Sequence, residues 1–284
     1  MRTALAMLIG GLSLAGCTTT PMIVNCDPFR TAYTGAVPRS DTFVEIQSDF
    51  APSPEAKLAD AGSEADKSIA YADLIGLTLP RGEALADGGV LALSGGGQWG
   101  AFGAGYLEQL QADGALPRFR MVTGVSTGAL QALFVGASQA PAGKAGEQPE
   151  NFLKQLTKEY TIDDEDEVVH RSGYLGAAVR GSVAKLDPLR LKIETALCSK
   201  APADPKTAEH CPLIKALGSA DAPVVMLGFV EAASGEMQAV NVSAISRAAV
   251  NGEMTVRQAQ QCITGGALAS VAMPFFYQQV QVTS

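Results

Sequence analysis

Two glycine-rich turns, about thirty residues apart, constrain the fold of this 284-residue chain more than any other feature. The first turn follows an apolar run (residues 90–93) and the second a strand-like run (residues 118–122), and each precedes a small-residue run of helical character (residues 101–112 and 129–137). Short apolar runs are typical of buried strands in a parallel sheet, and glycines permit a tight turn from such a strand into a helix. The sequence therefore predicts two consecutive βα units of an α/β fold.

The first turn has the spacing Gly95-x-Gly97-x-x-Gly100, which also occurs in dinucleotide-binding proteins. A dinucleotide site needs an acidic residue at the end of the next strand, about twenty residues on. Asp113 falls in a turn instead, and the next strand-like run ends near Thr123. The pattern therefore disfavours a dinucleotide site.

The second turn, Gly124-Val125-Ser126-Thr127-Gly128, has the spacing of a nucleophile elbow. In such an elbow, a serine between a strand and a helix presents its hydroxyl outward, and the helix N-terminus favours developing negative charge. Ser126 is therefore the candidate nucleophile of an acyl-transfer reaction.

The elbow gives the first turn a chemical role. Consecutive glycines leave their backbone N–H groups accessible, as an oxyanion hole for a tetrahedral acyl intermediate requires. The alternative is a tight turn that only packs against the sheet. We expect the oxyanion loop, with Gly95, Gly96, Gly97 and Gly100 as its candidate residues.

The chain resembles the patatin-like phospholipases in four segments that share order and spacing: residues 95–100 (GGGQWG), 124–128 (GVSTG), 186–190 (LDPLR) and 267–276 (ALASVAMPFF). The resemblance implies a three-layer α/β/α fold with a mainly parallel central sheet over residues 87–284. It also implies a phospholipase A or lysophospholipase-like esterase with a Ser–Asp dyad, in which Ser126 is the nucleophile. No metal or organic cofactor is implied. The family often has Lys or Arg in the glycine loop where this chain has Gln98 and Trp99, and Trp99 is expected at the acyl-chain entrance or buried in packing.

The resemblance further implies an aspartate, in an Asp–Gly pair, shortly after the segment matched by residues 274–276. No acidic residue follows Glu253, while Asp87, Asp113 and Asp187 lie too early or belong to another segment. A serine without a base is a weak nucleophile. We expect either a fragment cut just before the catalytic aspartate or a natural short form without activity. The strand-like run at residues 277–283, with no closing helix, favours a C-terminally truncated domain.

The N-terminus has the pattern of an export signal. Residues 3–16 are apolar and uncharged, too short to span a membrane, and end in Leu14-Ala15-Gly16-Cys17. This ending resembles the bacterial lipobox, in which the cysteine is lipidated. The sequence thus predicts a signal peptide at residues 1–16 and a lipid-anchored stalk and extension at residues 17–86, with a helix near residues 64–77. Thr18 after the cysteine favours the outer membrane over the inner membrane of a bacterial cell envelope.

The composition of the chain limits the classes of partner that it is expected to bind. A net charge of −8 makes nucleic acid a poor partner, so we expect a phospholipid or lysophospholipid substrate and a membrane surface. Four further cysteines suit an oxidising compartment. These four cysteines could form disulfides in three pairings, of which one with a Cys198–Cys211 bridge is favoured. The spacing of the cysteines does not suit a zinc site. The acidic run at residues 163–167 and His170 beside it are expected on a solvated surface, not around calcium.

Two alternatives to the dyad remain. A Ser–His–Asp triad of the α/β-hydrolase type would use His210, the plausible late histidine, which lies in a polar stretch. The other alternative is a non-catalytic lipoprotein that binds acyl chains or a partner at the membrane surface.

Overall fold

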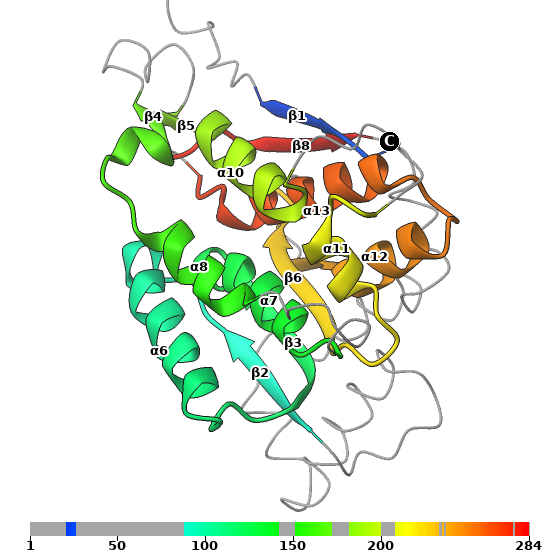
Figure 1. The fold of residues 1–284 in the computed structure, drawn as a ribbon. Helices are drawn as coiled ribbons and strands as arrows, with labels where there is room; N and C mark the ends of the chain where they lie inside the picture. The colour runs from blue at the N-terminus through cyan, green and yellow to red at the C-terminus, as the bar shows by residue number, and fades with distance from the viewer. Residues whose placement is uncertain are drawn as a thin grey trace, which may run out of the picture.

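A computed structural model describes residues 21–26, 88–141, 151–171, 182–199, 208–232, 235, 237–274 and 276–283. Its central sheet has the strand order β2-β3-β6-β7 (Figure 1). The strands are β2 (Gly89–Leu93), β3 (Phe119–Val125), β6 (Val224–Val230) and β7 (Met237–Asn241). β2, β3 and β6 run parallel, and β7 pairs antiparallel with β6. The predicted α/β class with a mainly parallel central sheet is confirmed.

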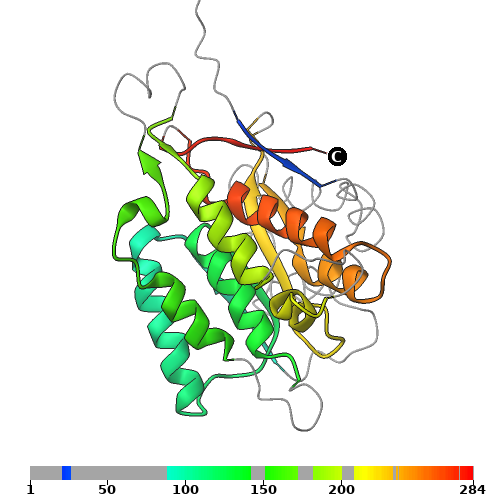
Figure 2. The ribbon, with the colours of Figure 1, turned by 45° about the horizontal axis from the view of Figure 1, so that its top comes forward.

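Seven α-helices occur in the described part of the chain: α6 (Gly100–Ala112), α7 (Thr127–Ser138), α8 (Phe152–Tyr160), α10 (Asp187–Leu197), α11 (Pro212–Leu217), α12 (Val242–Val250) and α13 (Val256–Val271). α7 packs on β3 and β6, and α13 packs on β6 beside it. α8 lies against both α6 and α7, while α11 contacts α7, α12 and α13. The described helices thus form one connected layer on a face of the sheet (Figures 1 and 2).

The core lies between this helical layer and the sheet. Val122, Val225, Leu227 and Val240 are fully buried from three adjacent strands. Small residues let the helices approach closely, because a Cβ at Gly266 of α13 would lie 2.8 Å from a methyl of Val240. The small-residue character of the helical runs is therefore a packing requirement of this layer.

Part of the expected stalk belongs to the packed domain. β1 (Met22–Asn25) pairs in parallel with β8 (Val280–Thr283), and Cys26 forms a disulfide with Cys262 of α13. Met22 and Val24 are buried while the residues between and after them are exposed, so β1 has one apolar face. The stalk and extension predicted at residues 17–86 did not include this strand, so the prediction is wrong at β1. Its apolar alternation is short and is surrounded by prolines in the sequence, which concealed it.

The second disulfide joins Cys198 to Cys211, as predicted. Cys198 follows α10 directly and Cys211 precedes α11, so the bridge holds the ends of two helices together. Cys17, the signal peptide and the helix predicted near residues 64–77 lie outside the described residues. Within the described residues, no helix has both the length and the apolar character needed to cross a membrane.

The remaining short elements lie between α8 and α10. They are a 3₁₀ turn, η3 (Glu165–Glu167), and the two-residue strands β4 (His170–Arg171) and β5 (Ala184–Lys185), which pair antiparallel. A further 3₁₀ turn, η2 (Gly97–Trp99), leads directly into α6.

Candidate active site

Parallel pairing brings the two glycine turns together. Leu93, the last residue of β2, is paired with Gly124 of β3, so both strands end at the same edge of the sheet. β6 ends there too, because Gly228 is paired with Val125. Three strand ends therefore converge on Ser126, at the carboxyl edge where α/β folds hold their ligands.

Ser126 occupies an unusual backbone conformation between β3 and α7. Its φ is 54° and its ψ is −126°, and it is the one non-glycine residue with positive φ among the residues that the structure describes. A side chain in such a conformation costs on the order of 1–3 kcal/mol, and strain of this kind gathers at functional sites. Its carbonyl accepts a hydrogen bond from the Ala129 N–H at 2.9 Å, so α7 starts at the serine itself.

The flanking glycines of the elbow are required by close backbone packing. A Cβ at Gly124 would lie 2.7 Å from the Ala129 nitrogen and would overlap the carbonyl of Gly128. A Cβ at Gly128 would overlap the Leu93 carbonyl and lie 2.7 Å from the Ser94 oxygen. The spacing GxSxG therefore reflects two contacts, one within the elbow at Gly124 and one between Gly128 and the end of β2.

The first turn lies directly against the elbow. A Cβ at Gly95 would be 3.1 Å from Cβ and 3.7 Å from Oγ of Ser126. Gly97 has a φ of +54°, with nothing within 4 Å of its Cβ position, so it turns the chain into η2 while leaving open space beside it. Gly100 closes the turn, since a Cβ there would overlap Thr127 Oγ1. The structure thus brings the predicted oxyanion residues beside the predicted nucleophile.

Tyr160, at the end of α8, fixes the residue after the serine. Its hydroxyl donates to the Thr127 carbonyl at 3.1 Å and also forms a hydrogen bond with Thr127 Oγ1. Burial raises the pKa of Tyr160, although hydrogen bonds from Thr127 and Gln131 oppose the rise. Gln131 also donates to the Gly100 carbonyl at 2.9 Å, which ties α7 to the first turn. Sequence reasoning missed Tyr160, since no local motif marks it.

Ser270, in the last turn of α13, contacts the nucleophile's own backbone. The Ser126 N–H donates to Ser270 Oγ at 2.8 Å, and this hydroxyl donates in turn to the Gly228 carbonyl at 2.5 Å. Ser270 belongs to the segment at residues 267–276 on which the family resemblance rests, and that segment was the one signal that could have indicated it.

A cleft of about 2010 Å³ opens beside Ser126. Gly97 and Gln98 of the first turn, the elbow, the end of β6 and the end of α13 all contribute to its wall. Most of its lining is aliphatic or aromatic, from α7, α8, α10 and the segment after α13. A cleft of this size and character suits a ligand with long apolar chains.

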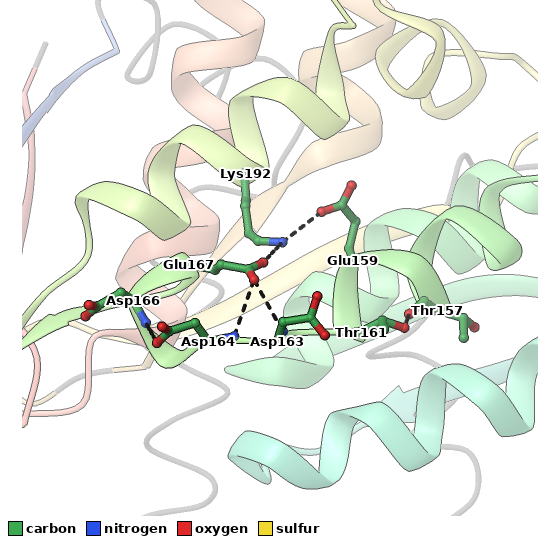
Figure 3. A network of polar contacts seen from close by, with 8 residues as sticks. All are labelled: Thr157, Glu159, Thr161, Asp163, Asp164, Asp166, Glu167 and Lys192. Atoms are coloured by element: carbon green, nitrogen blue, oxygen red, sulfur yellow. Dashed lines mark hydrogen bonds and ion pairs between the residues drawn. The ribbon is translucent and has the colours of Figure 1, made fainter.

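The cleft wall also carries charged side chains, among them Lys192 and Glu159. Lys192 of α10 pairs with Glu159 at 3.4 Å and with Glu167 at 3.7 Å (Figure 3). Glu167 also accepts hydrogen bonds from the backbone N–H groups of Asp163 and Asp164, at 3.3 and 3.4 Å. The acidic run is exposed, as predicted, and this network accounts for its compact turn.

Other candidate residues lie apart from the serine. His170 and His210 are exposed, and neither lines the cleft. Trp99 is 74% exposed, so the buried packing role considered for it is wrong. Asp113 ends α6 on the surface, far along the helix from the turn. Among the described residues, no group of three or more His, Cys, Asp or Glu side chains could hold a metal ion.

Comparison with known families gives one finding that bears on this site. The family model described as patatin-like phospholipase matches residues 91–284, more than half of the chain and all of the site described above. None of the curated proteins compared with the chain matches it.

Proposed function

Since the chain belongs to the patatin-like phospholipase family, we propose that it removes acyl chains from phospholipids or lysophospholipids, with Ser126 as the nucleophile. The observation that carries the assignment is the strained backbone of Ser126, at a φ of 54°, facing an apolar cleft beside the glycine turn. Strain persists only where the surrounding structure over-determines it, and here three strand ends and two helices do so.

The reaction follows from this arrangement. Ser126 Oγ attacks the ester carbonyl and loses its proton to a general base, while the backbone N–H groups of Gly96 and Gly97 stabilise the oxyanion. The carbon–oxygen bond to the leaving alcohol then breaks, and that alcohol takes the proton. Water attacks the acyl-serine in a second, equivalent step and releases the fatty acid.

The base in this proposal is an aspartate, as in the dyad implied by the family resemblance. No acidic residue follows Glu253 within residues 1–284, so the proposal depends on whether the natural protein contains this aspartate. The intact mass of that protein and the sequence of its last peptide test the assignment. An Asp–Gly pair after residue 284 would complete the dyad, whereas a natural end at Ser284 would remove this base from the proposal.

The nucleophile is tested with Ser126→Ala and a serine-directed fluorophosphonate probe on the natural protein. We expect hydrolysis of a phospholipid or short-chain ester to fall by roughly three orders of magnitude, with labelling abolished. Ser138→Ala is the matched control, because Ser138 ends the same helix and donates only to the Val135 carbonyl. Labelling that survives Ser126→Ala, or is lost equally in Ser138→Ala, would overturn the assignment.

A Ser–His–Asp triad is less well supported. His210 is exposed and does not line the cleft that contains Ser126. Hydrolysis that is unaffected by His210→Ala would exclude the triad. Loss of hydrolysis in a folded His210→Ala variant would support it.

A non-catalytic lipid-binding role makes a different prediction. A protein of that kind would bind lipid in the cleft without covalent reaction at Ser126. Robust phosphonate labelling of the natural protein, at Ser126 by peptide mapping, would eliminate this alternative.

Membrane attachment through Cys17 is also part of the proposal. The uncharged run that ends in Leu14-Ala15-Gly16-Cys17 supports lipidation of this cysteine and a place in the bacterial envelope, on the outer membrane. Each buried CH₂ of an acyl chain would contribute roughly 0.8 kcal/mol to anchoring. An alkyne-tagged palmitate should label the wild-type protein, and Cys17→Ser should lose both the label and sedimentation with membranes. Equal labelling of the two proteins would contradict this part of the proposal.

A further inference from the structure

We propose that Ser270 is a positioning residue, which holds the backbone of Ser126 in the conformation that presents its hydroxyl to the cleft. The inference rests on the proposed role of Ser126 as nucleophile and adds a residue to that site. Ser270 lies 144 residues after Ser126, on α13, and contacts it through the backbone N–H rather than through the reacting hydroxyl.

The position of the contact explains what it does. The pairing of β3 with β6 ends at Val125 and Gly228, and Ser126 is the first residue to leave the sheet. Ser270 Oγ lies between the Ser126 N–H, at 2.8 Å, and the Gly228 carbonyl, at 2.5 Å. The hydroxyl therefore bridges β6 and the turning chain at the point where direct pairing stops.

The strain at Ser126 makes this bridge consequential. A non-glycine residue at a φ of 54° would relax toward negative φ unless its peptide groups were held. Its carbonyl is held by the N–H of Ala129 in α7, at 2.9 Å. Its N–H is held by Ser270, so the serine is fixed on both sides. Without the contact to Ser270, the peptide group before Ser126 rotates more freely. The Ser126 hydroxyl then moves away from the reacting carbonyl.

The chain contains a matched bridge outside the site. Ser243 of α12 accepts a hydrogen bond from the Val225 N–H at 2.9 Å and donates to the Pro223 carbonyl at 3.0 Å. The two serines thus have the same donor and acceptor pattern, but Ser243 acts at the amino end of β6. Removal of either hydroxyl takes a partner from one backbone N–H and one carbonyl, so a purely structural role predicts similar effects.

The first test measures hydrogen exchange of the Ser126 amide by NMR, which requires no catalytic activity. In the wild-type protein this amide should be protected like those of β3. Ser270→Ala should speed its exchange by about tenfold or more, and Ser243→Ala should leave it unchanged. An unprotected Ser126 amide in the wild-type protein would overturn the proposal even if Ser270→Ala did not fold.

The second test measures ester hydrolysis and phosphonate labelling of the natural protein in the same variants. Ser270→Ala should lower kcat and the labelling rate about tenfold or more with KM unchanged, because small displacements of a reacting group are costly. Ser243→Ala should lower the melting temperature about as much as Ser270→Ala does, but it should keep the wild-type kcat. Ser270→Thr, which retains a hydroxyl, should recover part of the rate lost in Ser270→Ala. Equal loss of kcat in the two alanine variants would refute a positioning role.

These tests separate the two proposals. A natural protein that is neither labelled nor hydrolytic would defeat the proposed function, while amide exchange would still decide whether Ser270 holds the Ser126 backbone. A labelled protein whose rate is indifferent to Ser270→Ala would defeat the positioning role alone.

Discussion

The two glycine turns at the carboxyl edge of the sheet use glycine for different reasons. At Gly124 and Gly128 of the elbow, the Cβ positions are occupied by backbone atoms of neighbouring segments. At Gly97 of the first turn nothing lies within 4 Å, and a Cβ at Gly96 would make only an ordinary contact with Trp99, at 3.6 Å. Gly124 and Gly128 of the elbow thus need glycine to pack, as Gly100 of the first turn does, whereas Gly97 needs it to turn the chain and leave the backbone open. Similar motifs in sequence therefore predict different responses to the same substitution.

Gly128→Ala should have the largest effect on folding. Its methyl group would overlap the Leu93 carbonyl and lie 2.7 Å from the Ser94 oxygen, and these backbone atoms are fixed at the end of β2. We expect the free energy of unfolding to fall by about 3 kcal/mol or more, measured by urea denaturation.

The control for this substitution is Gly105→Ala, on α6, where nothing lies within 4 Å of the Cβ position. Because alanine favours the helix more than glycine does, this substitution should leave the free energy of unfolding unchanged or raise it by about 0.5–1 kcal/mol. Equal stability of Gly128→Ala and the wild-type protein would show that the elbow can move away from β2.

Gly97→Ala should have an intermediate effect, caused by conformation alone. The residue has a φ of +54° in open space, so alanine adds strain without a steric overlap. We expect a loss of about 1–2 kcal/mol in the free energy of unfolding. Gly97→Asn should lose less, because asparagine tolerates this conformation better than alanine. A larger loss for asparagine than for alanine would indicate crowding rather than strain.

The elements of the fold that depend on short-range sequence patterns could be predicted from the sequence. The two strand–turn–helix units lie within a few residues of their expected bounds. Each follows from apolar runs, small-residue helices and glycine spacing, which act over a few residues along the chain. The juxtaposition of Ser126 with the glycine turn was also predictable, because parallel strands end at a shared edge.

The contacts that fix the site were not predictable in this way. Ser270 contacts Ser126 across 144 residues, Tyr160 contacts Thr127 across 33, and Cys26 reaches Cys262 across 236. A serine or tyrosine carries no local mark of such a partner, since its hydroxyl can bond to any nearby backbone group. β1 was missed for the same reason: its partner, β8, lies at the other end of the described chain.

Tyr160→Phe tests how far the stability of the elbow depends on its hydrogen bonds to α8. The substitution removes the hydrogen bonds to Thr127 and should lower the free energy of unfolding by about 1 kcal/mol at pH 8. Burial raises the pKa of Tyr160 above its ordinary value of 10.0 in the folded protein. The contribution of the neutral phenol is therefore complete below pH 10 and is lost as the pH rises from there through the folded pKa.

In urea titrations, the wild-type advantage over Tyr160→Phe should accordingly stay constant from pH 8 to about pH 10 and shrink between about pH 10 and pH 11. Tyr106→Phe is the control, because Tyr106 is exposed on α6 and its ring stacks on Phe102 without needing the hydroxyl. An advantage that grows with pH would contradict the stated direction of the pKa shift.

Gly96→Ala should have the smallest effect, and it completes the contrast between the turns. The φ of Gly96 is 175°, outside the left-handed region that favours glycine, and the added methyl would meet only Trp99 Cβ at 3.6 Å. We expect the free energy of unfolding to stay within about 0.5 kcal/mol of wild type. Alanine also keeps the backbone N–H, so ester hydrolysis should change little if that group binds the oxyanion. A stable Gly96→Ala protein with much slower hydrolysis would instead mean that the substrate occupies the space beside this Cα, and the glycine would then serve access rather than conformation.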